Sequence, residues 1–246
     1  MKHIKLFETI NEYNTWLNSN NFITPYIVKN KETKIVSYQK KQKYYDAEIE
    51  YLESTGTQYI DTNIIPNENT GIRIYSIHGN YTDKYAVGLR NNTNATRWCI
   101  GHKDHEWYCG YGDVIYIFNT INDGINEYEE KQRIVTDLCE ISLNYMNNKK
   151  AKVYNLMSTN TYEVNLPELS FIPSYTIRLF GTSGVNATYT KWDGKIYGVK
   201  ISQGTNLIMD LIPVRKDGVG YMFDKVTKRL FGNNGTGTFI LGPDIA

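Results

Sequence analysis

The sequence is poor in several features that mark large classes of protein. It has 6 prolines and 3 cysteines among 246 residues, and its formal charge is +1. Because the cysteines are few and odd in number, we expect reduced thiols rather than a disulfide framework. A nearly neutral chain also lacks the basic excess of nucleic-acid-binding domains. We therefore expect neither a disulfide scaffold nor a nucleic-acid partner.

Long apolar runs are also missing, so no transmembrane helix and no membrane partner are expected. The N-terminus, MKHIKLFETINEYNTW, lacks the apolar core and small-residue cleavage site of a secretory signal peptide. We expect no export by the general secretory route.

What the sequence does contain favours strands and turns. Tyrosine is very abundant, with 21 residues, and Thr, Ile and Val suit a pleated, half-buried surface. Asn and Gly suit the turns between strands. The stretch 221–243 shows the pattern most clearly: it reads as apolar, polar, apolar, glycine-rich and apolar again, which predicts a β-meander.

Residues 1–45 differ from the rest of the chain. Strand-like runs at 4–7, 22–28 and 34–38 flank a short helix that Thr9 and Glu12 would cap. This small N-terminal α+β module buries little apolar surface alone, so we expect it to need a partner surface. The polar stretch 39–46 is the expected linker.

Residues 46–246 read as a succession of short alternating strands separated by turn signals, without long helical periodicity. This pattern predicts a mainly β protein whose C-terminal domain is an antiparallel β-sandwich. The expected strands lie at 49–52, 58–62, 71–77, 85–89, 97–101, 106–111, 114–118, 132–137, 140–145, 151–155, 162–166, 176–180, 194–202 and 207–214.

Three motifs carry a resemblance over about residues 47–246. They are EYLESTGTQYIDT at 50–62, WDGKIYGVKI at 192–201 and DLIPVR at 210–215. In this order they resemble the concanavalin A-like (laminin-G-like) jelly-roll domains of gut bacterial phages and surface proteins. The resemblance implies that the last strand, 237–241, lies in the same sandwich as the first strands.

The N-terminal segment carries a separate resemblance through Phe7, Tyr13, Trp16, the run 22–25 and the run 35–38. It looks like the leader module of virion proteins from phages of gut Bacteroidetes, including the crAss-like group. The run Tyr26-Ile27-Val28 departs from the usual leader. The resemblance implies a virion location and docking on the major capsid protein or another virion protein. As docking anchors we expect the aromatic residues and proline of this small module: Phe7, Trp16, Phe22, Pro25 and Tyr26.

One cluster could hold a metal ion. Cys99, His102, His105 and Cys109 supply four potential zinc ligands within eleven residues. Their spacing matches no zinc-finger pattern, and the alternative is a hairpin whose arms carry the cysteines as packing residues. We expect the hairpin and no metal.

Calcium is a second alternative, since laminin-G-like domains often hold this ion at the rim of the sandwich. Asp83, Asn122, Asp123 and Asn186 could serve, but ordinary turn formation explains them as well. No cofactor is expected.

Catalysis is not expected either. The acidic groups Glu127, Glu129, Glu130, Asp104 and Glu106 show no paired motif of the kind that glycosidases use. The corner Gly232–Gly237 resembles a phosphate-binding loop only superficially, because a strand and not a helix follows it.

Two functions are compatible with these residues. The first is a non-enzymatic phage virion protein, a capsid decoration or head-fibre-like protein that displays the jelly roll outward, alone or as a homo-oligomer. The alternative is a lectin-like module that binds host or mucus glycans. For the alternative, Trp98, Trp107 and Trp192 are candidate stacking residues, although aromatic residues in a sandwich more often form its core.

Overall fold

The computed structural model describes residues 26–29, 36–39, 43–78, 84–91, 96–103, 106–118, 137–184 and 192–245. The chain divides into two compact units, Met1–Tyr44 and Tyr45–Ala246. In the first unit, β1 (Tyr26–Lys29) pairs antiparallel with β2 (Val36–Gln39), as the runs at 22–28 and 34–38 predicted. The expected strand at 4–7 and the expected helix after Thr9 lie outside the described residues.

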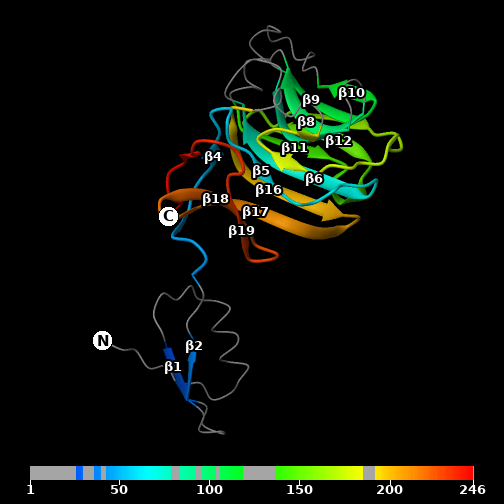
Figure 1. Ribbon diagram of the computed structural model, residues 1–246. Coiled ribbons are helices and arrows are strands. Elements are labelled where there is room, and N and C mark those ends of the chain that lie inside the picture. Colours follow the sequence, from blue (N-terminus) through cyan, green and yellow to red (C-terminus); the bar gives the residue numbers. More distant parts are fainter. Residues whose placement is uncertain are drawn as a thin grey trace. The chain divides into compact units, whose positions relative to one another are not determined.

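The described strands of the second unit form two sheets (Figure 1). A seven-stranded sheet has the order β10-β9-β8-β7-β14-β5, with β15 beside β7. An eleven-stranded sheet has the order β13-β12-β11-β6-β16-β17-β18-β19, with β4 on β16, β20 on β4 and β3 on β17. The pairing is antiparallel except between β15 and β7. The prediction of a mainly β protein with an antiparallel sandwich is therefore confirmed.

The bounds of the strands in the first sheet are β5 (Ile60–Asp61), β7 (Lys84–Arg90), β8 (Arg97–Lys103), β9 (Glu106–Gly112), β10 (Val114–Ile117), β14 (Arg178–Leu179) and β15 (Ser183–Gly184). Those in the second are β3 (Ala47–Glu48), β4 (Leu52–Glu53), β6 (Thr70–Ile77), β11 (Cys139–Leu143), β12 (Lys150–Asn155), β13 (Thr161–Asn165), β16 (Lys195–Gln203), β17 (Asn206–Lys216), β18 (Val219–Asp224), β19 (Arg229–Phe231) and β20 (Ile240–Leu241). A single 3-10 turn, Tyr145–Asn147, is described between β11 and β12.

Alternation along the strands explains how the core forms. In β6, Ile72 and Ile74 are fully buried, while Arg73 and Tyr75, which follow them in alternation, are half-buried on the other face. Because side chains in a strand point to alternate faces, every second residue enters the space between the sheets. Each fully buried Ile contributes roughly 1.5–3 kcal/mol to folding through removal of its apolar surface from water.

The hairpin of β8 and β9 buries side chains on both of its faces. Trp98 and Trp107 point into the core, whereas Tyr108 lies on the outer face, where its ring covers Gly101. A Cβ at Gly101 would lie 2.5 Å from the Tyr108 ring, so only glycine leaves room for this contact. The usual alternation of a half-exposed strand is therefore absent here, and β9 is almost wholly buried.

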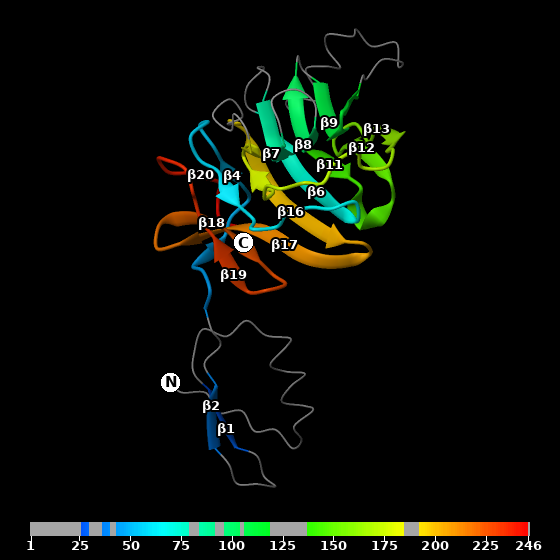
Figure 2. The same cartoon turned by 45° about the vertical axis from the view of Figure 1, so that its right-hand side comes forward.

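The last strand lies beside the first ones, as the resemblance implied (Figure 2). Leu241 pairs with Leu52 through β20 and β4, and the preceding corner joins the segment 57–61. Gly235 is required there, because a Cβ would lie 2.2 Å from the carbonyl oxygen of Thr57. We call this contact of residues 57–61 with residues 232–241 the closing seam. The glycines of the corner turn the backbone, as predicted.

The two ends of the second unit also meet. A bridge joins Ile49 to Asp244, and the backbone N–H of Ile245 donates to the carbonyl of Glu48 at 2.9 Å. The Arg215 guanidinium pairs with the Asp244 carboxylate at 2.6 Å. Among the described residues, no helix has the length and apolar character needed to cross a membrane.

Candidate functional site

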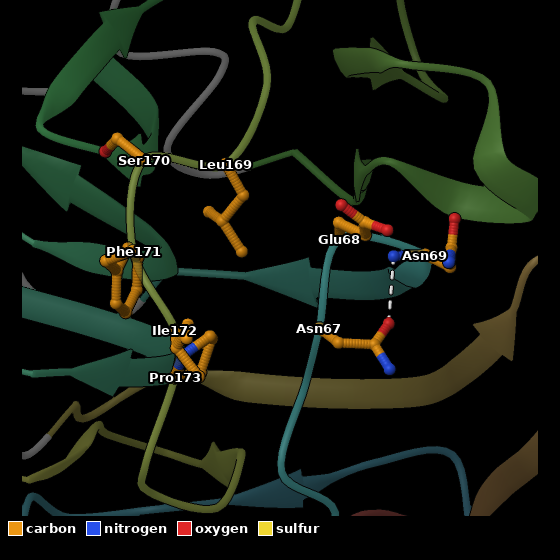
Figure 3. Close-up of a pocket in the computed structure, with 8 residues that line it drawn as sticks. All are labelled: Asn67, Glu68, Asn69, Leu169, Ser170, Phe171, Ile172 and Pro173. Carbon is orange, nitrogen blue, oxygen red and sulfur yellow. Dashed lines mark hydrogen bonds between the residues drawn. The ribbon is translucent and has the colours of Figure 1, made fainter.

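An open groove of about 420 Å³ lies at one end of the sandwich (Figure 3). One wall is the turn Asn67–Asn69, which precedes β6, and the other is the loop Leu169–Pro173, which precedes β14. Its volume falls within the range of about 300–1,000 Å³ that is usual for small-ligand sites. Polar side chains on one wall thus face a mostly apolar segment on the other.

Hydrogen bonds fix the turn that forms the first wall. The Asn67 side-chain oxygen accepts from the backbone N–H of Asn69 at 2.9 Å and from Gln203 Nε2 at 2.8 Å. The Thr70 hydroxyl donates to Gln203 Oε1 at 3.0 Å and accepts from the Asn67 N–H at 2.8 Å. Asn at this position is suited to such side-chain to backbone bonding. The turn is therefore held in one conformation without any ligand.

Buried groups beneath the turn hold its carbonyl groups. The Nδ2 of Asn144, a fully buried residue, donates to the carbonyl of Glu68 at 2.9 Å, and the N–H of Gly204 donates to the carbonyl of Asn69 at 2.8 Å. Gly71 allows this close approach, because a Cβ there would lie 2.1 Å from the Asn144 carbonyl oxygen. The backbone of the first wall has little freedom to move away from a bound ligand.

The second wall combines apolar side chains with a tethered backbone. Leu169 and Phe171 are half-buried and pack against the core, Pro173 is buried, and Ile172 is 89% exposed. The Asn91 side chain ties this loop to the end of β7: its Nδ2 donates to the Ile172 carbonyl at 3.3 Å. Phe171 therefore lines the groove and at the same time packs against the core.

Several polar groups of the first wall remain available for a ligand. Among the described residues, none hydrogen-bonds to the Asn67 Nδ2, the Asn69 side chain or the Glu68 carboxylate. Asn67 and Glu68 are exposed and Asn69 is half-buried. Amide and carboxylate groups that the fold does not use can serve as donors and acceptors for a bound molecule.

Two buried polar groups lie on the same end of the sandwich. Trp98 and Tyr111 are paired across β8 and β9, and the Trp98 indole N–H and the Tyr111 hydroxyl have no hydrogen-bond partner among the described residues. Burial, with smaller contributions from the charges of Glu168 and Glu68, raises the pKa of Tyr111 to about 12. The Tyr111 hydroxyl thus stays protonated throughout the physiological range.

The three tryptophans predicted as glycan-stacking residues do not line the groove. Trp98, Trp107 and Trp192 are fully buried, and each belongs to the core. A ring can stack on a sugar only through an accessible face, so in this structure these residues pack the sandwich instead. The choice of these three residues is corrected accordingly: the core interpretation holds for all of them.

The two cysteines of the cysteine and histidine cluster point away from each other. Cys99 opposes Gly110 across the hairpin, while Cys109 opposes Ile100, so the two thiols point to opposite faces of the sheet. His102 shares the core face and stacks on His78, with ring centroids 3.9 Å apart. His105 lies outside the described residues. Within the described ranges, no three His, Cys, Asp or Glu side chains group as a metal site.

Other predicted residues lie outside the described part of the chain. These are the docking residues Phe7, Trp16, Phe22 and Pro25, the calcium candidates Asp83, Asn122, Asp123 and Asn186, and the acidic residues Asp104, Glu127, Glu129 and Glu130. Tyr26 is the first residue of β1. The docking hypothesis therefore stays a prediction.

The groove residues themselves were not predicted as a site. The turn Asn67–Asn69 lies between two expected strands, 58–62 and 71–77, but it precedes the second wall by about 100 positions, and no local pattern joins them. One usable signal was the stretch LPELSFIP at 166–173, where apolar residues lie between two prolines in a loop. An apolar loop of this kind often marks a surface that binds something.

Comparisons with known proteins support the fold. No family model matches the chain, and no curated protein matches it. A solved structure of a candidate carbohydrate-binding protein from Bacteroides ovatus aligns with a TM-score of 0.51 and 11% identity, over 94% of this chain and 73% of that chain. Scytalido-glutamic peptidase with a peptide-based transition state analog aligns over 71% of this chain and 91% of that chain, at 12% identity and a TM-score of 0.30, too low to indicate a shared fold.

Proposed function

We propose that the sandwich is a non-enzymatic carbohydrate-binding domain and that the groove between Asn67–Asn69 and Leu169–Pro173 is its binding site. The observation that carries this proposal is a rigid, open groove in which unused amide and carboxylate groups lie beside an apolar ring. The fold match to a candidate carbohydrate-binding protein supports it.

The groove offers both kinds of contact that a sugar needs. Hydroxyl groups of a pyranose would donate to the Glu68 carboxylate and the side-chain oxygen Oδ1 of Asn69, and would accept from Asn67 Nδ2. The apolar C–H face of the ring would pack on Phe171. Since each hydrogen bond contributes only about 0.5–1.5 kcal/mol net, we expect weak binding, with a Kd between about 1 mM and 1 μM.

The first test is a titration of the full chain with a panel of neutral oligosaccharides, followed by NMR or calorimetry. Phe171→Ala should weaken binding of any ligand found about tenfold. Phe231→Ala is the matched control, because Phe231 is also half-buried and packs against the core but belongs to β19. Equal loss of binding in the two variants, or no binding by the wild type, would overturn the proposal.

For the whole chain we propose a second, compatible role: residues 1–44 attach the protein to a phage particle, as a capsid decoration or head-fibre-like protein, and the sandwich is displayed. The division into two units supports this proposal, together with the leader-like residues Phe7, Trp16, Phe22, Pro25 and Tyr26. A chain that lacks residues 1–44 should fold but should no longer join particles. Incorporation of the shortened chain into particles would contradict the attachment role.

A further inference from the structure

The groove carries uncompensated negative charge. Glu68 is the charged residue among the eight that line it, and no described cation pairs with its exposed carboxylate. We infer that the groove prefers an amino sugar, a pyranose with a protonated amine, over a neutral sugar, and that it rejects acidic sugars. This inference rests on the proposed function and names the ligand class of the same groove.

The neighbouring charges do not reverse this field. Lys149 is the described lysine beside the turn, since its N–H donates to Asn144 Oδ1, but its ammonium pairs with Glu168 at 3.8 Å. Asp113 adds a further carboxylate beside the second wall, 3.5 Å from the Ser170 hydroxyl. The Lys149 ammonium is therefore engaged by Glu168 and does not neutralise Glu68.

The position of Glu68 is fixed at its backbone. Its carbonyl accepts from Asn144 Nδ2, and its neighbours Asn67 and Asn69 are joined by a hydrogen bond of 2.9 Å. The carboxylate therefore projects from a rigid turn, and its charge stays at the rim of the groove. An amine on a bound pyranose would gain the attraction of an exposed ion pair, which corresponds to about a two- to fivefold gain in affinity. A uronic acid would meet repulsion of similar size.

The experiment compares three β-1,4-linked tetrasaccharides of equal length with the full chain, by calorimetry at low ionic strength and mildly acidic pH. They are a glucosamine tetramer, its N-acetylated neutral form and a glucuronic acid tetramer. We expect affinity to fall in this order, with about two- to fivefold between the first two. Equal affinities, or preference for the acidic tetramer, would overturn the inference.

Two variants locate the effect. Glu68→Gln keeps the size and polarity of the side chain but removes its charge, so the ratio of the affinities for the glucosamine tetramer and its N-acetylated form should fall to about one, even if the loss of a carboxylate acceptor weakens binding of both. Glu50→Gln makes the same change at an exposed residue next to β4 and should leave the preference intact. If Glu50→Gln abolishes the preference as well, the preference arises from general attraction to the protein surface and not from the groove.

Raising the pH until the amine loses its proton provides an internal control: the preference should disappear while binding of the neutral form persists. Failure of the inference alone is recognisable, because the neutral tetramer would bind and Phe171→Ala would weaken it without any preference for the amine. If no tetramer binds, both the inference and the proposed function fail.

Discussion

Asparagine side chains have different roles at the closing seam and at the groove. In the seam, Asn233 uses its whole amide: Oδ1 accepts from the N–H groups of Tyr59 at 3.2 Å and Gly235 at 2.8 Å, and Nδ2 donates to the Gly237 carbonyl at 2.9 Å. In the groove, no described residue bonds to the Asn69 side chain. The Asn233 side chain is thus fully used in intramolecular hydrogen bonds, whereas the Asn69 side chain is available to a ligand.

The difference shows how a turn-rich sandwich separates stability from binding. Polar groups that satisfy buried backbone atoms cannot also bind a ligand without cost, because the backbone would lose a partner. The seam contains such groups, whereas in the groove Asn144 satisfies backbone carbonyls from beneath, and the Asn69 side chain and the Glu68 carboxylate have no described hydrogen-bond partner. Substitutions in the seam should therefore affect stability, and substitutions in the groove should affect binding.

The largest effect is expected for Gly235→Ala in the seam. The added Cβ would lie 2.2 Å from the Thr57 carbonyl oxygen and 3.1 Å from the Gln58 Cα, which are backbone atoms that cannot move aside cheaply. We expect a loss of about 3 kcal/mol in the free energy of unfolding, measured by chemical denaturation. Gly204→Ala is the control: its φ is +59° but nothing lies within 4 Å, so a loss of only about 1 kcal/mol is expected. Equal losses of stability in Gly235→Ala and Gly204→Ala would show that the backbone around Gly235 moves to relieve the clash.

Asp224, in the turn that leads to the seam, should make stability depend on pH. Its fully buried carboxylate accepts from the N–H groups of Asp210, Val226 and Thr227 and from the Thr227 hydroxyl. Desolvation acts to raise the pKa of Asp224, but these hydrogen bonds outweigh it, so the pKa is lowered from the ordinary 3.8. The stabilisation is therefore present above pH 3.8 and is lost as the pH falls through the lower folded value.

The measurement is the free energy of unfolding between about pH 6 and pH 2 for the wild type and Asp224→Asn. At pH 6 the variant should be about 2 kcal/mol less stable, because a carboxylate with several donors is replaced by a neutral amide. The two proteins should converge on acidification. A constant difference across this range would contradict the assigned pKa shift.

A pair of alanine substitutions compares the two asparagines directly. Asn233→Ala should cost about 1–2 kcal/mol of stability, because it leaves backbone groups of the seam without partners, and should not change ligand affinity at a temperature where the variant is folded. Asn69→Ala should change stability by less than about 0.5 kcal/mol but weaken glycan binding several-fold. Denaturation and titration of both variants test the separation; loss of affinity in Asn233→Ala alone would reverse it.

The smallest effect, and one of opposite sign, is expected for Tyr111→Phe. The hydroxyl is buried without a described hydrogen-bond partner, so its removal should leave stability unchanged or raise it by up to about 1 kcal/mol. The size of the difference depends on pH: burial raises the pKa of Tyr111 from 10 to about 12, so the unfolded state loses its proton first and the stability of the wild type falls as the pH rises from about 10 towards 12. Near pH 11 the variant should gain on the wild type in thermal denaturation. Destabilisation at neutral pH would indicate a partner for the hydroxyl.

Much of the fold was predictable because it depends on local periodicity. The alternation at 71–77 and the break at 224–228 both correspond to observed structure, β6 and the turn between β18 and β19. The run at 49–52 was expected to be one strand, but Ile49 forms an isolated bridge and Leu52 begins β4. The run is split because Ile49 bonds to β17 whereas β4 pairs with β16. Such long-range pairing leaves no pattern in the local sequence.

The site was less predictable, because exposure is decided by the sheets and not by residue type. Trp98 and Trp107 looked suited to a sugar, yet their register on β8 and β9 directs them into the core. Asn67 and Phe171 lie 104 positions apart and meet only because β6 and β14 belong to facing layers. A one-residue shift in register would have placed the tryptophans on the other face of the sheet, and the sequence alone does not set that register.

The bridge of Ile49 with Asp244 has a consequence for engineering. Because the N–H of Ile245 reaches the Glu48 carbonyl at 2.9 Å, the polypeptide enters and leaves the second unit at adjacent points. A unit with adjoining ends can be inserted into a surface loop of an unrelated host, or circularly permuted with a short connecting peptide, without being stretched. The sandwich is therefore suited to use as an inserted domain in engineered fusion proteins.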